Sequence, residues 1–306
     1  MLAYAARRCA GVLPALLVIV TISFFVLRLA PGGPFSGEQG LPPAIRANLE
    51  AAYGLDRPLI VQYGRYLAGL LHGDFGPSFK QRDTQVSELM RRGLPISAIL
   101  GLSAVIAALL LGLPLGVSAA LRRNSALDRG AAVWTALAIA LPSFVVGPFL
   151  ALVFGLHLRW LPVAGWQPDV QHLLLPVLTL ALPVSAYIAR LARASLLEVL
   201  KSDFVRTARA KGLPEMQVIL RHALRPALLP VVSYLGPATA AIVTGSLIVE
   251  TVFALPGTGR YLVEGAIDRD YTLVMGMIIV YGTFTLLCNL VADLLYGWLD
   301  PRVRYE

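Results

Sequence analysis

Residues 93–121 read GLPISAILGLSAVIAALLLGLPLGVSAAL and contain no Asp, Glu, Lys, Arg or His. A bilayer core about 30 Å thick is crossed by a helix of about 20 apolar residues. Inside hydrocarbon every backbone amide needs a hydrogen-bond partner within the protein, and this run lacks the polar alternation of a membrane β-strand. The stretch therefore predicts a transmembrane helix.

Five further runs share this lack of charged residues and His. They are residues 9–27, 130–156, 173–189, 226–249 and 271–292. The run at 173–189 is short for a full span and must take its ends from His172 or Arg190. Together the runs predict an all-α membrane protein with six transmembrane helices. Prolines interrupt several of them, which is typical of transporters and of membrane enzymes alike.

The overall composition agrees with a chain that faces lipid. Apolar residues make up 57% of the chain, charged residues 14%, and the mean hydropathy is +0.70. Because soluble domains carry about 25% charged residues, this composition excludes a soluble enzyme, a disordered protein and a disulfide-rich secreted domain. The two cysteines, Cys9 and Cys288, lie far apart in apolar stretches, so we expect neither a disulfide framework nor a metal cluster.

The distribution of basic residues predicts the orientation in the membrane. The apolar run at 9–27 is preceded by Arg7 and Arg8, as the apolar core of a secretory signal peptide is preceded by basic residues. It is longer than a signal core of about 7–15 residues and lacks a small-x-small cleavage site after it, so an uncleaved helix is the preferred interpretation. If the N-terminus is cytoplasmic, the cytoplasmic segments are 1–8, 122–129, 190–225 and 293–306. These segments then hold most of the Lys and Arg residues outside the long first loop, as the positive-inside rule expects. We expect a multi-pass protein with both termini cytoplasmic, whose net charge of +8 sets orientation and does not bind nucleic acid.

Two long segments between the runs predict short helices. Within the outer loop, residues 42–55 and 59–71 have helical spacing of apolar residues, and they either cap the helix ends or contact an external protein. In the basic segment 190–225, Gly212 is expected to end one helix and Pro214 to begin the next. This hairpin has an apolar face that either packs under its own bundle or docks in a groove on another protein.

The motifs of common catalytic sites are missing from the sequence. No HExxH or G-x-S-x-G motif occurs, and none of the three lysines follows a glycine as in a P-loop. We therefore predict no catalytic residues, no metal ligands and no cofactor. Energy for any transport must then come from an ion gradient or from another subunit. No run has an acid at its centre, and Glu250 and Asp293 at the span ends are either ordinary helix-end residues or a proton relay, so a helper ATPase is favoured.

The run at 226–249 is rich in small residues. Its hydroxyl-bearing residues Thr239, Thr244 and Ser246 either pack helices together or face a polar lumen. With Glu250 just beyond them, they are the candidate residues of a translocation path.

Residues 204–214, FVRTARAKGLP, followed by residues 220–230, LRHALRPALLP, resemble the coupling loop of ABC-importer permeases of the oligopeptide and dipeptide class. The generic family signature begins Glu-Ala-Ala and has a Gly four residues after the second Ala. Here Arg206, Thr207 and Ala208 fill the first slots and Gly212 is retained, a departure typical of the peptide subgroup. The resemblance extends over essentially the whole chain and is greatest to B-type oligopeptide permease subunits. Further similar segments are residues 54–63, 73–76, 250–259, 269–271, 293–296 and 300–305.

The resemblance implies the type I ABC importer (MetI-like) permease fold, with cytoplasmic coupling helices. It implies an N-terminal transmembrane helix (1–30), a periplasmic loop with short helices (31–93), a transmembrane type-1 domain of five helices (94–293) and a cytoplasmic tail (294–306). The residues expected to couple to an ATPase are Arg206, Thr207, Ala208, Lys211, Gly212, Leu213 and Pro214.

The resemblance also implies partners and a location. The expected partners are a second homologous permease subunit in a heterodimer, two cytoplasmic ABC ATPases, a periplasmic peptide-binding protein and a peptide substrate, all at the lipid bilayer of a bacterial inner membrane. The chain would be a transport subunit and not an enzyme, because ATP hydrolysis belongs to the ATPases. The same importer class with a non-peptide substrate such as a nickel complex, an ion-gradient-driven carrier and an intramembrane enzyme are the alternatives.

Overall fold

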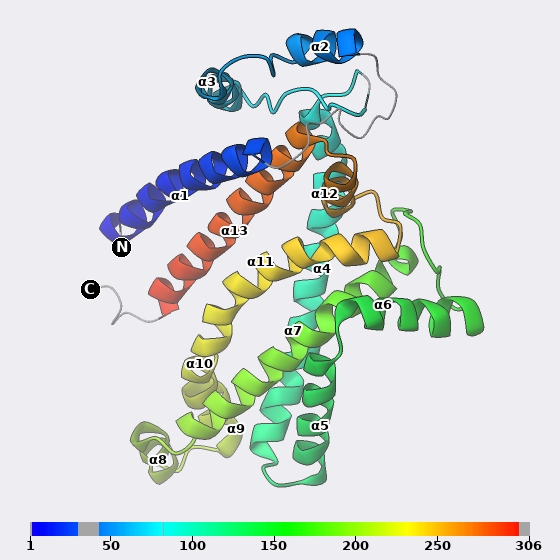
Figure 1. The fold of residues 1–306 in the computed structure, drawn as a ribbon. Helices are drawn as coiled ribbons and strands as arrows, with labels where there is room; N and C mark the ends of the chain where they lie inside the picture. Colours follow the sequence, from blue (N-terminus) through cyan, green and yellow to red (C-terminus); the bar gives the residue numbers. More distant parts are fainter. Residues whose placement is uncertain (1, 30–42, 82, 300–306) are drawn as a thin grey trace. The chain divides into compact units, whose positions relative to one another are not determined.

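The computed structural model describes residues 2–29, 43–81 and 83–299, and helices dominate this part of the chain. Five of its helices are long and apolar enough to cross a membrane singly (Figure 1). They are α1 (Leu2–Leu29), α4 (Val86–Leu121), α7 (Val170–Val199), α11 (Leu229–Val252) and α13 (Tyr271–Leu299). Four of the six predicted runs lie within single helices, and the run at 226–249 does so from Leu229 onward.

The run at 130–156 folds as two helices instead of one. α5 (Ala126–Ala140) is followed by α6 (Ser143–Leu150), which continues into a π-helical turn, η1 (Ala151–His157), and the two arms are bent by 102°. Leu141 at the break is extended, with ψ 117°, because a residue that precedes proline is pushed out of the helical region. The count of six spans therefore depends on taking this bent pair as one.

Prolines inside the other helices do not break them. Pro176 and Pro183 both lie within the continuous α7, and Pro237 lies within α11. Neighbouring helices can satisfy the carbonyls that such prolines free. A proline in an apolar run therefore marks a position where a break can occur and does not by itself predict one.

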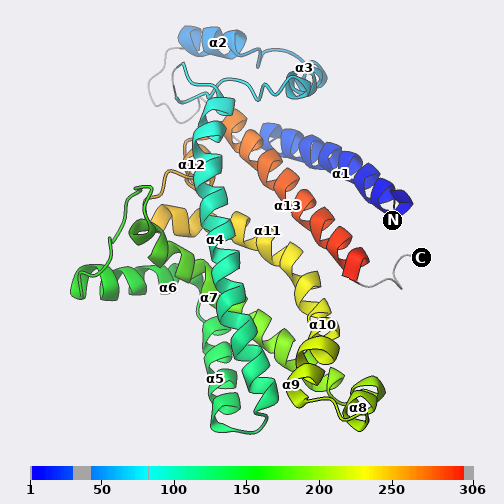
Figure 2. The ribbon, with the colours of Figure 1, turned by 180° about the vertical axis from the view of Figure 1, so that it is seen from behind.

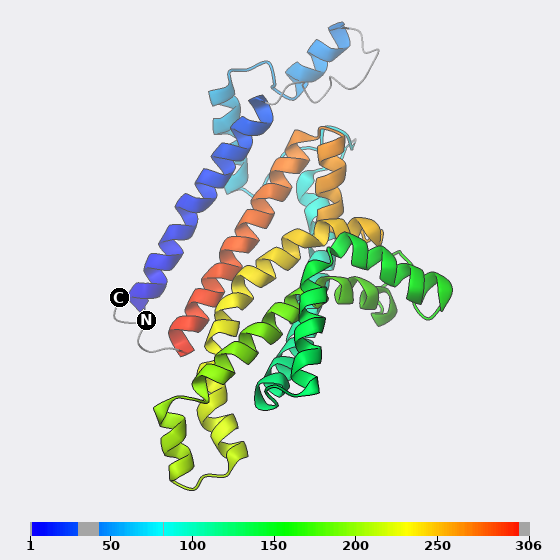
Figure 3. The ribbon, with the colours of Figure 1, turned by 60° about the horizontal axis from the view of Figure 1, so that its bottom comes forward.

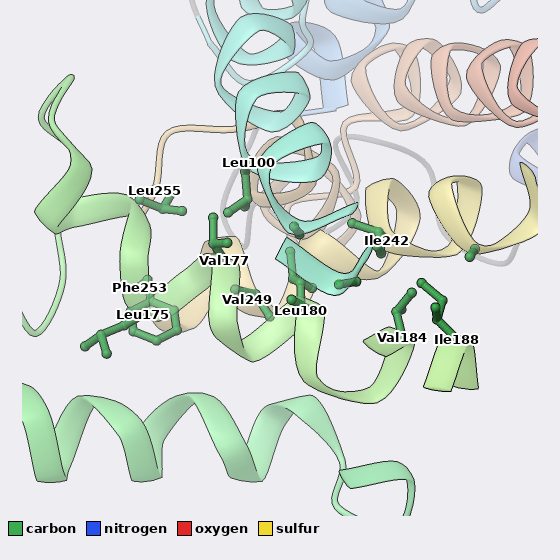
Figure 4. Packing of buried hydrophobic residues seen from close by; sticks show 14 of the residues in the cluster. Leu100, Leu175, Val177, Leu180, Val184, Ile188, Ile242, Val249, Phe253 and Leu255 are labelled. Atoms are coloured by element: carbon green, nitrogen blue, oxygen red, sulfur yellow. The ribbon is translucent and has the colours of Figure 1, made fainter. Parts of the chain in front are cut away.

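The chain divides into two compact units, one formed by Met1–Ala10, Ala98–Leu255 and Phe284–Glu306, the other by Gly11–Ser97 and Pro256–Thr283. The core of the first unit lies around α7. Figure 4 shows Leu180 of α7 near Val249 of α11, with Ile242 of α11 in the same buried cluster. α7 is thus the central helix of this unit, and it is the most buried of the five single spans.

Helices α4 and α7 approach each other closely through two glycines one helical turn apart. A Cβ atom at Gly112 would lie 2.4 Å from the carbonyl oxygen of Ser185, and one at Gly116 would lie 2.4 Å from that of Ala189. Figure 2 shows the two helices crossing. Small residues at this spacing let helix backbones touch within a membrane, where packing replaces the hydrophobic effect.

The second unit contains the two short helices predicted in the outer loop. α2 (Pro43–Ala52) and α3 (Leu59–Leu71) confirm that prediction, and Gly54, two residues after the end of α2, has a positive φ of +65°. A hydrogen bond joins α3 to the second half of α1, where the hydroxyls of Tyr63 and Thr21 are 2.6 Å apart.

In the same unit α12 (Thr258–Ile267) is hydrogen-bonded to the first third of α4. The hydroxyls of Ser97 and Thr258 are 2.9 Å apart, and the Thr258 backbone N–H donates to the Ser97 oxygen. All three of these polar atoms are buried, so the hydrogen bonds satisfy groups that water cannot reach.

Candidate functional site: the 203–227 hairpin

The segment between α7 and α11 forms a helical hairpin, residues 203–227, outside the apolar spans. Its first arm is α8 (Asp203–Ala210), and its return arm consists of α9 (Glu215–Gln217), the π-helical turn η2 (Val218–Ala223) and α10 (Leu224–Ala227). Figure 3 shows both arms beyond the end of α7. The predicted helix end near Gly212 and the predicted start after Pro214 are confirmed.

Gly212 provides the turn between the arms. Its φ is +76°, in the left-handed region that side chains with a Cβ rarely adopt, and its N–H donates to the carbonyl oxygen of Arg209 at 2.9 Å. No atom lies within 4 Å of the position that a Cβ would take. The glycine is therefore needed for its backbone conformation and not for lack of space.

A two-pronged ion pair joins the arms across this turn. Arg209 Nε donates to Glu215 Oε2 at 3.1 Å, and Arg209 Nη2 donates to Glu215 Oε1 at 2.6 Å. These hydrogen bonds lower the pKa of the Glu215 carboxyl and raise the pKa of the Arg209 guanidinium. Two parallel bonds also fix the relative orientation of the planar groups, so the pair holds the turn in one geometry.

One face of the hairpin packs against its own bundle. Val205 and Ala208 of α8 are buried in a cluster with Ala120 of α4 and Leu196 of α7. The return arm contributes to the same cluster through Val218, Ala223 and Ala227. Motion of the hairpin would therefore be passed directly to the ends of α4 and α7.

The opposite face of the hairpin is exposed and carries large apolar side chains. Phe204, Met216 and Leu220 are each at least half exposed. Among the predicted coupling residues, most lie on the exposed side of the hairpin or in its turn, while Leu213 is half-buried and Ala208 packs inward; the exposed ones are Arg206, Thr207, Lys211, Gly212 and Pro214. The two alternative roles of the hairpin are thus not exclusive, because one face packs on the bundle and the other is available to a partner.

An ion pair braces the helix that leads into the hairpin. Arg193 of α7 donates from Nε to Asp128 Oδ1 at 2.5 Å and from Nη2 to Asp128 Oδ2 at 2.9 Å. Asp128 lies in the first turn of α5 and also accepts the backbone N–H of Asn124 at 2.9 Å. The turn between α4 and α5 is therefore tied to α7 less than two turns before that helix ends.

The sequence matches two family descriptions that together cover nearly all of it. Residues 112–305 match the binding-protein-dependent transport system inner membrane component, and residues 1–101 match the N-terminal part of such membrane components. The chain belongs to this family of permeases. The resemblance found in the coupling segment is thereby confirmed.

Relatives of the permease include chains named for peptide transport. It is 48% identical to the oligopeptide transport system permease protein OppB of Salmonella typhimurium and 49% identical to that of Escherichia coli, over the full length of both chains in each case. It is 43% identical to the dipeptide transport system permease protein DppB of Bacillus subtilis, over 99% of this chain and 98% of the relative.

A solved structure has the same fold as the permease. A chain of the MetNI methionine ABC transporter in an inward-facing conformation superposes with a TM-score of 0.56, over 69% of this chain and 96% of that one, at 20% identity. At this identity the likeness speaks for the fold alone. It confirms the prediction of an all-α type I ABC importer permease fold.

The candidate translocation residues of the permease lie on α11. The hydroxyl of the fully buried Ser246 is 2.7 Å from the carbonyl oxygen of Val243 and 2.8 Å from Oε1 of Glu250, which is fully buried as well. Thr239 is half-buried and donates to the carbonyl oxygen of Leu235 at 2.7 Å. The structure thus brings Ser246 and Glu250 together inside the first unit, and their place in a path stays a prediction.

Some predicted features fall outside the described residues. They are the side chains of Thr244 and Asp293 and the tail motif at 300–306. No cluster of His, Cys, Asp and Glu that could hold a metal occurs among the residues that were described.

Sequence reasoning missed the two ion pairs of this region. Arg209 and Glu215 lie on opposite sides of a predicted Gly-Pro turn, so their opposite charges could have indicated the contact. Asp128 and Arg193 are separated by a whole bent span, and no local signal in the sequence connects them.

Proposed function

We propose that this chain is a transmembrane permease subunit of an ABC importer that moves oligopeptides or dipeptides from the periplasm to the cytoplasm. The observation that carries the proposal is full-length identity of 43–49% to permeases named for oligopeptide and dipeptide transport. The proposal includes a second permease subunit in a heterodimer, two cytoplasmic ATPases, which hydrolyse the ATP, and a periplasmic peptide-binding protein.

The 203–227 hairpin is the point of attachment for an ATPase in this proposal. Its exposed face combines large apolar side chains with the basic residues Arg206 and Lys211, a composition suited to a groove with apolar and acidic lining. Its inward face rests on α4 and α7, so closure of the ATPases moves the ends of both helices. The bundle then alternates between inward-open and outward-open states, whose populations are shifted by differential contacts with the ATPases.

The proposed orientation rests on the order of the spans along the chain. If the hairpin meets a cytoplasmic ATPase, counting spans with the bent pair taken as one puts the N- and C-termini on the cytoplasmic side and α2 and α3 on the periplasmic side. This agrees with the excess of Lys and Arg in the short loops on the hairpin's side.

The test is peptide uptake by the reconstituted complex with the exposed apolar face intact or altered. We expect uptake of radiolabelled trialanine into proteoliposomes only when ATP is on the ATPase side. Phe204→Asp should reduce uptake and peptide-stimulated ATP hydrolysis at least tenfold, because a charge would replace an apolar contact. The matched control is Leu71→Asp, a large apolar and even more exposed residue on α3, which should leave ATP hydrolysis unchanged.

Other outcomes would select another function. Uptake driven by an ion gradient without ATPases would contradict the proposal and favour a carrier. ATP-dependent uptake of a nickel complex with no uptake of peptide would keep the importer and reject the substrate.

A further inference from the structure

The second unit contains a cavity of about 270 Å³ beside the end of α1. It is bounded by α1, by α3 and by the extended segment that follows α3, all within Gly11–Ser97, with Thr272 of α13 at one side. The polar side chains of its lining include Arg28, Gln62, Arg65, Tyr66 and Asp74. None of these residues belongs to the hairpin or to the candidate translocation path.

Two buried polar atoms next to this cavity have no hydrogen-bond partner. Among the described residues, Nε of Arg28 and the hydroxyl of Tyr66 are the buried side-chain nitrogen or oxygen atoms left unsatisfied, and both residues line the cavity. Buried polar groups in native proteins are almost always paired, because an unpaired one loses its bonds to water without compensation. Two such atoms beside one cavity indicate that something outside the described residues completes their hydrogen bonds.

The guanidinium of Arg28 is held in place by neighbours that do not form a hydrogen bond with its buried Nε. Its Nη1 donates to Gln62 Oε1 at 2.5 Å, and it lies 5.3 Å from the centre of the Phe24 ring. Gln62 is itself fixed, because its Nε2 donates to the carbonyl oxygens of Leu55 at 3.1 Å and Arg57 at 2.7 Å. The position of the unpaired donor is therefore preset and does not depend on a ligand.

The unpaired groups call for an oxygen acceptor with negative charge. Arg28 Nε–H is a donor, and burial raises the pKa of Tyr66, so its hydroxyl remains a donor at neutral pH. Arg65 adds a second positive charge to the lining. A carboxylate between such groups forms charge-assisted hydrogen bonds, which are stronger than those to a neutral oxygen.

The remaining lining residues limit the identity of the anion. Asp74, whose carboxylate accepts the backbone N–H of Gly76 at 2.8 Å, brings a negative charge that disfavours a doubly charged phosphate and favours an ammonium group. Aromatic walls, Tyr53, Phe75 and Phe79 among them, suit a small apolar side chain. The cavity is slightly smaller than typical small-molecule sites of about 300–1,000 Å³, so the ligand is limited to one or two amino-acid residues in size.

We propose that this cavity binds the C-terminal carboxylate of a short peptide, through Arg28 and Tyr66, with Asp74 facing its amino group. The carboxylate follows from the unpaired donors, whereas its source in a peptide rests on the proposed function. On the proposed orientation the cavity lies on the periplasmic side, so the site would hold a peptide before it enters the transport path.

The experiment measures binding of L-alanyl-L-alanine to the full-length chain in detergent micelles by titration calorimetry. Tyr66→Phe should weaken binding about tenfold, because it removes one hydrogen bond to a charged group. The matched control is Tyr63→Phe, on the same helix, since the Tyr63 hydroxyl is already paired with Thr21 and does not line the cavity. Its affinity for the dipeptide should equal that of the unaltered chain.

A second measurement separates a ligand site from a structural role. The melting temperature of Tyr66→Phe without peptide should equal or exceed that of the unaltered chain, because the variant loses only an unpaired hydroxyl. A lowered melting temperature with unchanged affinity would assign the hydroxyl to the folded structure and overturn the proposal.

Three further titrations test the chemistry of the ligand. L-alanyl-L-alaninamide, which lacks the carboxylate, should bind at least tenfold more weakly than the acid, and equal binding of the two would overturn the proposal. Tighter binding of inorganic phosphate than of the dipeptide would assign the site to phosphate and would equally overturn it. Absence of binding by either anion would also reject the site.

The outcome is separable from that of the proposed function. Binding is measured on the chain without ATP or partners, whereas the function is measured as uptake by the complex. If the chain does not bind the dipeptide but the complex takes up peptide, this inference alone is overturned. If the chain binds the carboxylate but the complex takes up no peptide, the proposed function alone is overturned.

Discussion

The contact between α4 and α7 and the turn of the 203–227 hairpin both depend on glycine, but for opposite reasons. At Gly112 and Gly116 a Cβ would collide with the backbone of α7, while the glycines themselves lie in an ordinary helix. At Gly212 a Cβ would meet nothing, but the φ of +76° strains any other residue. Glycine therefore supplies close packing in the first region and backbone freedom in the second, and substitutions can tell the two apart.

Substitution of a glycine at the contact between α4 and α7 is expected to have the largest effect on stability. Gly116→Leu should destabilise the chain by about 3 kcal/mol or more, because the added atoms push α4 away from the backbone of Ala189 and leave neighbouring core residues unpacked. Thermal unfolding in detergent, together with the fraction of monodisperse protein, measures this loss.

The control is a glycine in a helix with open space around it. Nothing lies within 4 Å of a Cβ at Gly130 in α5, so Gly130→Ala should be neutral or stabilising by about 0.5 kcal/mol. Should Gly116→Ala melt at the same temperature as Gly130→Ala, close packing would not be the reason for the glycine.

Substitution of Gly212 in the hairpin turn is expected to have a smaller, local effect on stability. Gly212→Val should cost about 1–2 kcal/mol, confined to the hairpin, because the strain arises in one turn. Gly212→Asn should cost less, since asparagine tolerates positive φ better than other residues with a side chain. Hydrogen exchange of residues 203–217 and peptide-stimulated ATP hydrolysis in the complex are the measurements. Equal protection in the valine and asparagine variants would rule out backbone strain as the cause.

The ion pair across the same turn predicts the smallest effect, with a defined pH dependence. The pKa of Glu215 is lowered in the folded protein, so the pair contributes stability above the unfolded pKa of about 4.3, and this contribution is lost as the pH falls through the lower folded value. Glu215→Gln should reduce protection of residues 209–217 slightly at pH 7, and the difference from the unaltered chain should shrink as the pH falls below the unfolded pKa of about 4.3.

The matched control is Glu264→Gln, which removes a similarly exposed partner of Arg260 on α12. Protection of residues 209–217 should not change in this variant. A difference between Glu215→Gln and the unaltered chain that does not shrink as the pH is lowered would show that the charge of Glu215 is not what stabilises the turn.

Sequence patterns predicted the features whose causes are local. Apolar runs predicted five single spans, helical spacing predicted α2 and α3, and the Gly and Pro near residue 212 predicted the hairpin. Each of these depends on residues within one helix or one turn, so the printed sequence contains its cause.

Features that depend on distant neighbours could not be predicted in the same way. Gly112 and Gly116 have the spacing of a helix-packing motif, but the sequence does not identify Ser185 and Ala189 as the partners. The pair of Asp128 with Arg193 requires the folded path of the chain. Both contacts are decided by how helices cross, which no local pattern encodes.

The elbow at Leu141 and Pro142 has a consequence for the surroundings of the chain. The 15 residues of α5 rise by about 22 Å, so this arm alone does not traverse a hydrocarbon layer of about 30 Å. The extended residue Leu141 and the proline Pro142 end the series of backbone hydrogen bonds of α5. Both residues are exposed on the surface of this chain. Carbonyls released from a helix cost several kcal/mol each against acyl chains, so another polypeptide or trapped water, and not lipid, must border the elbow.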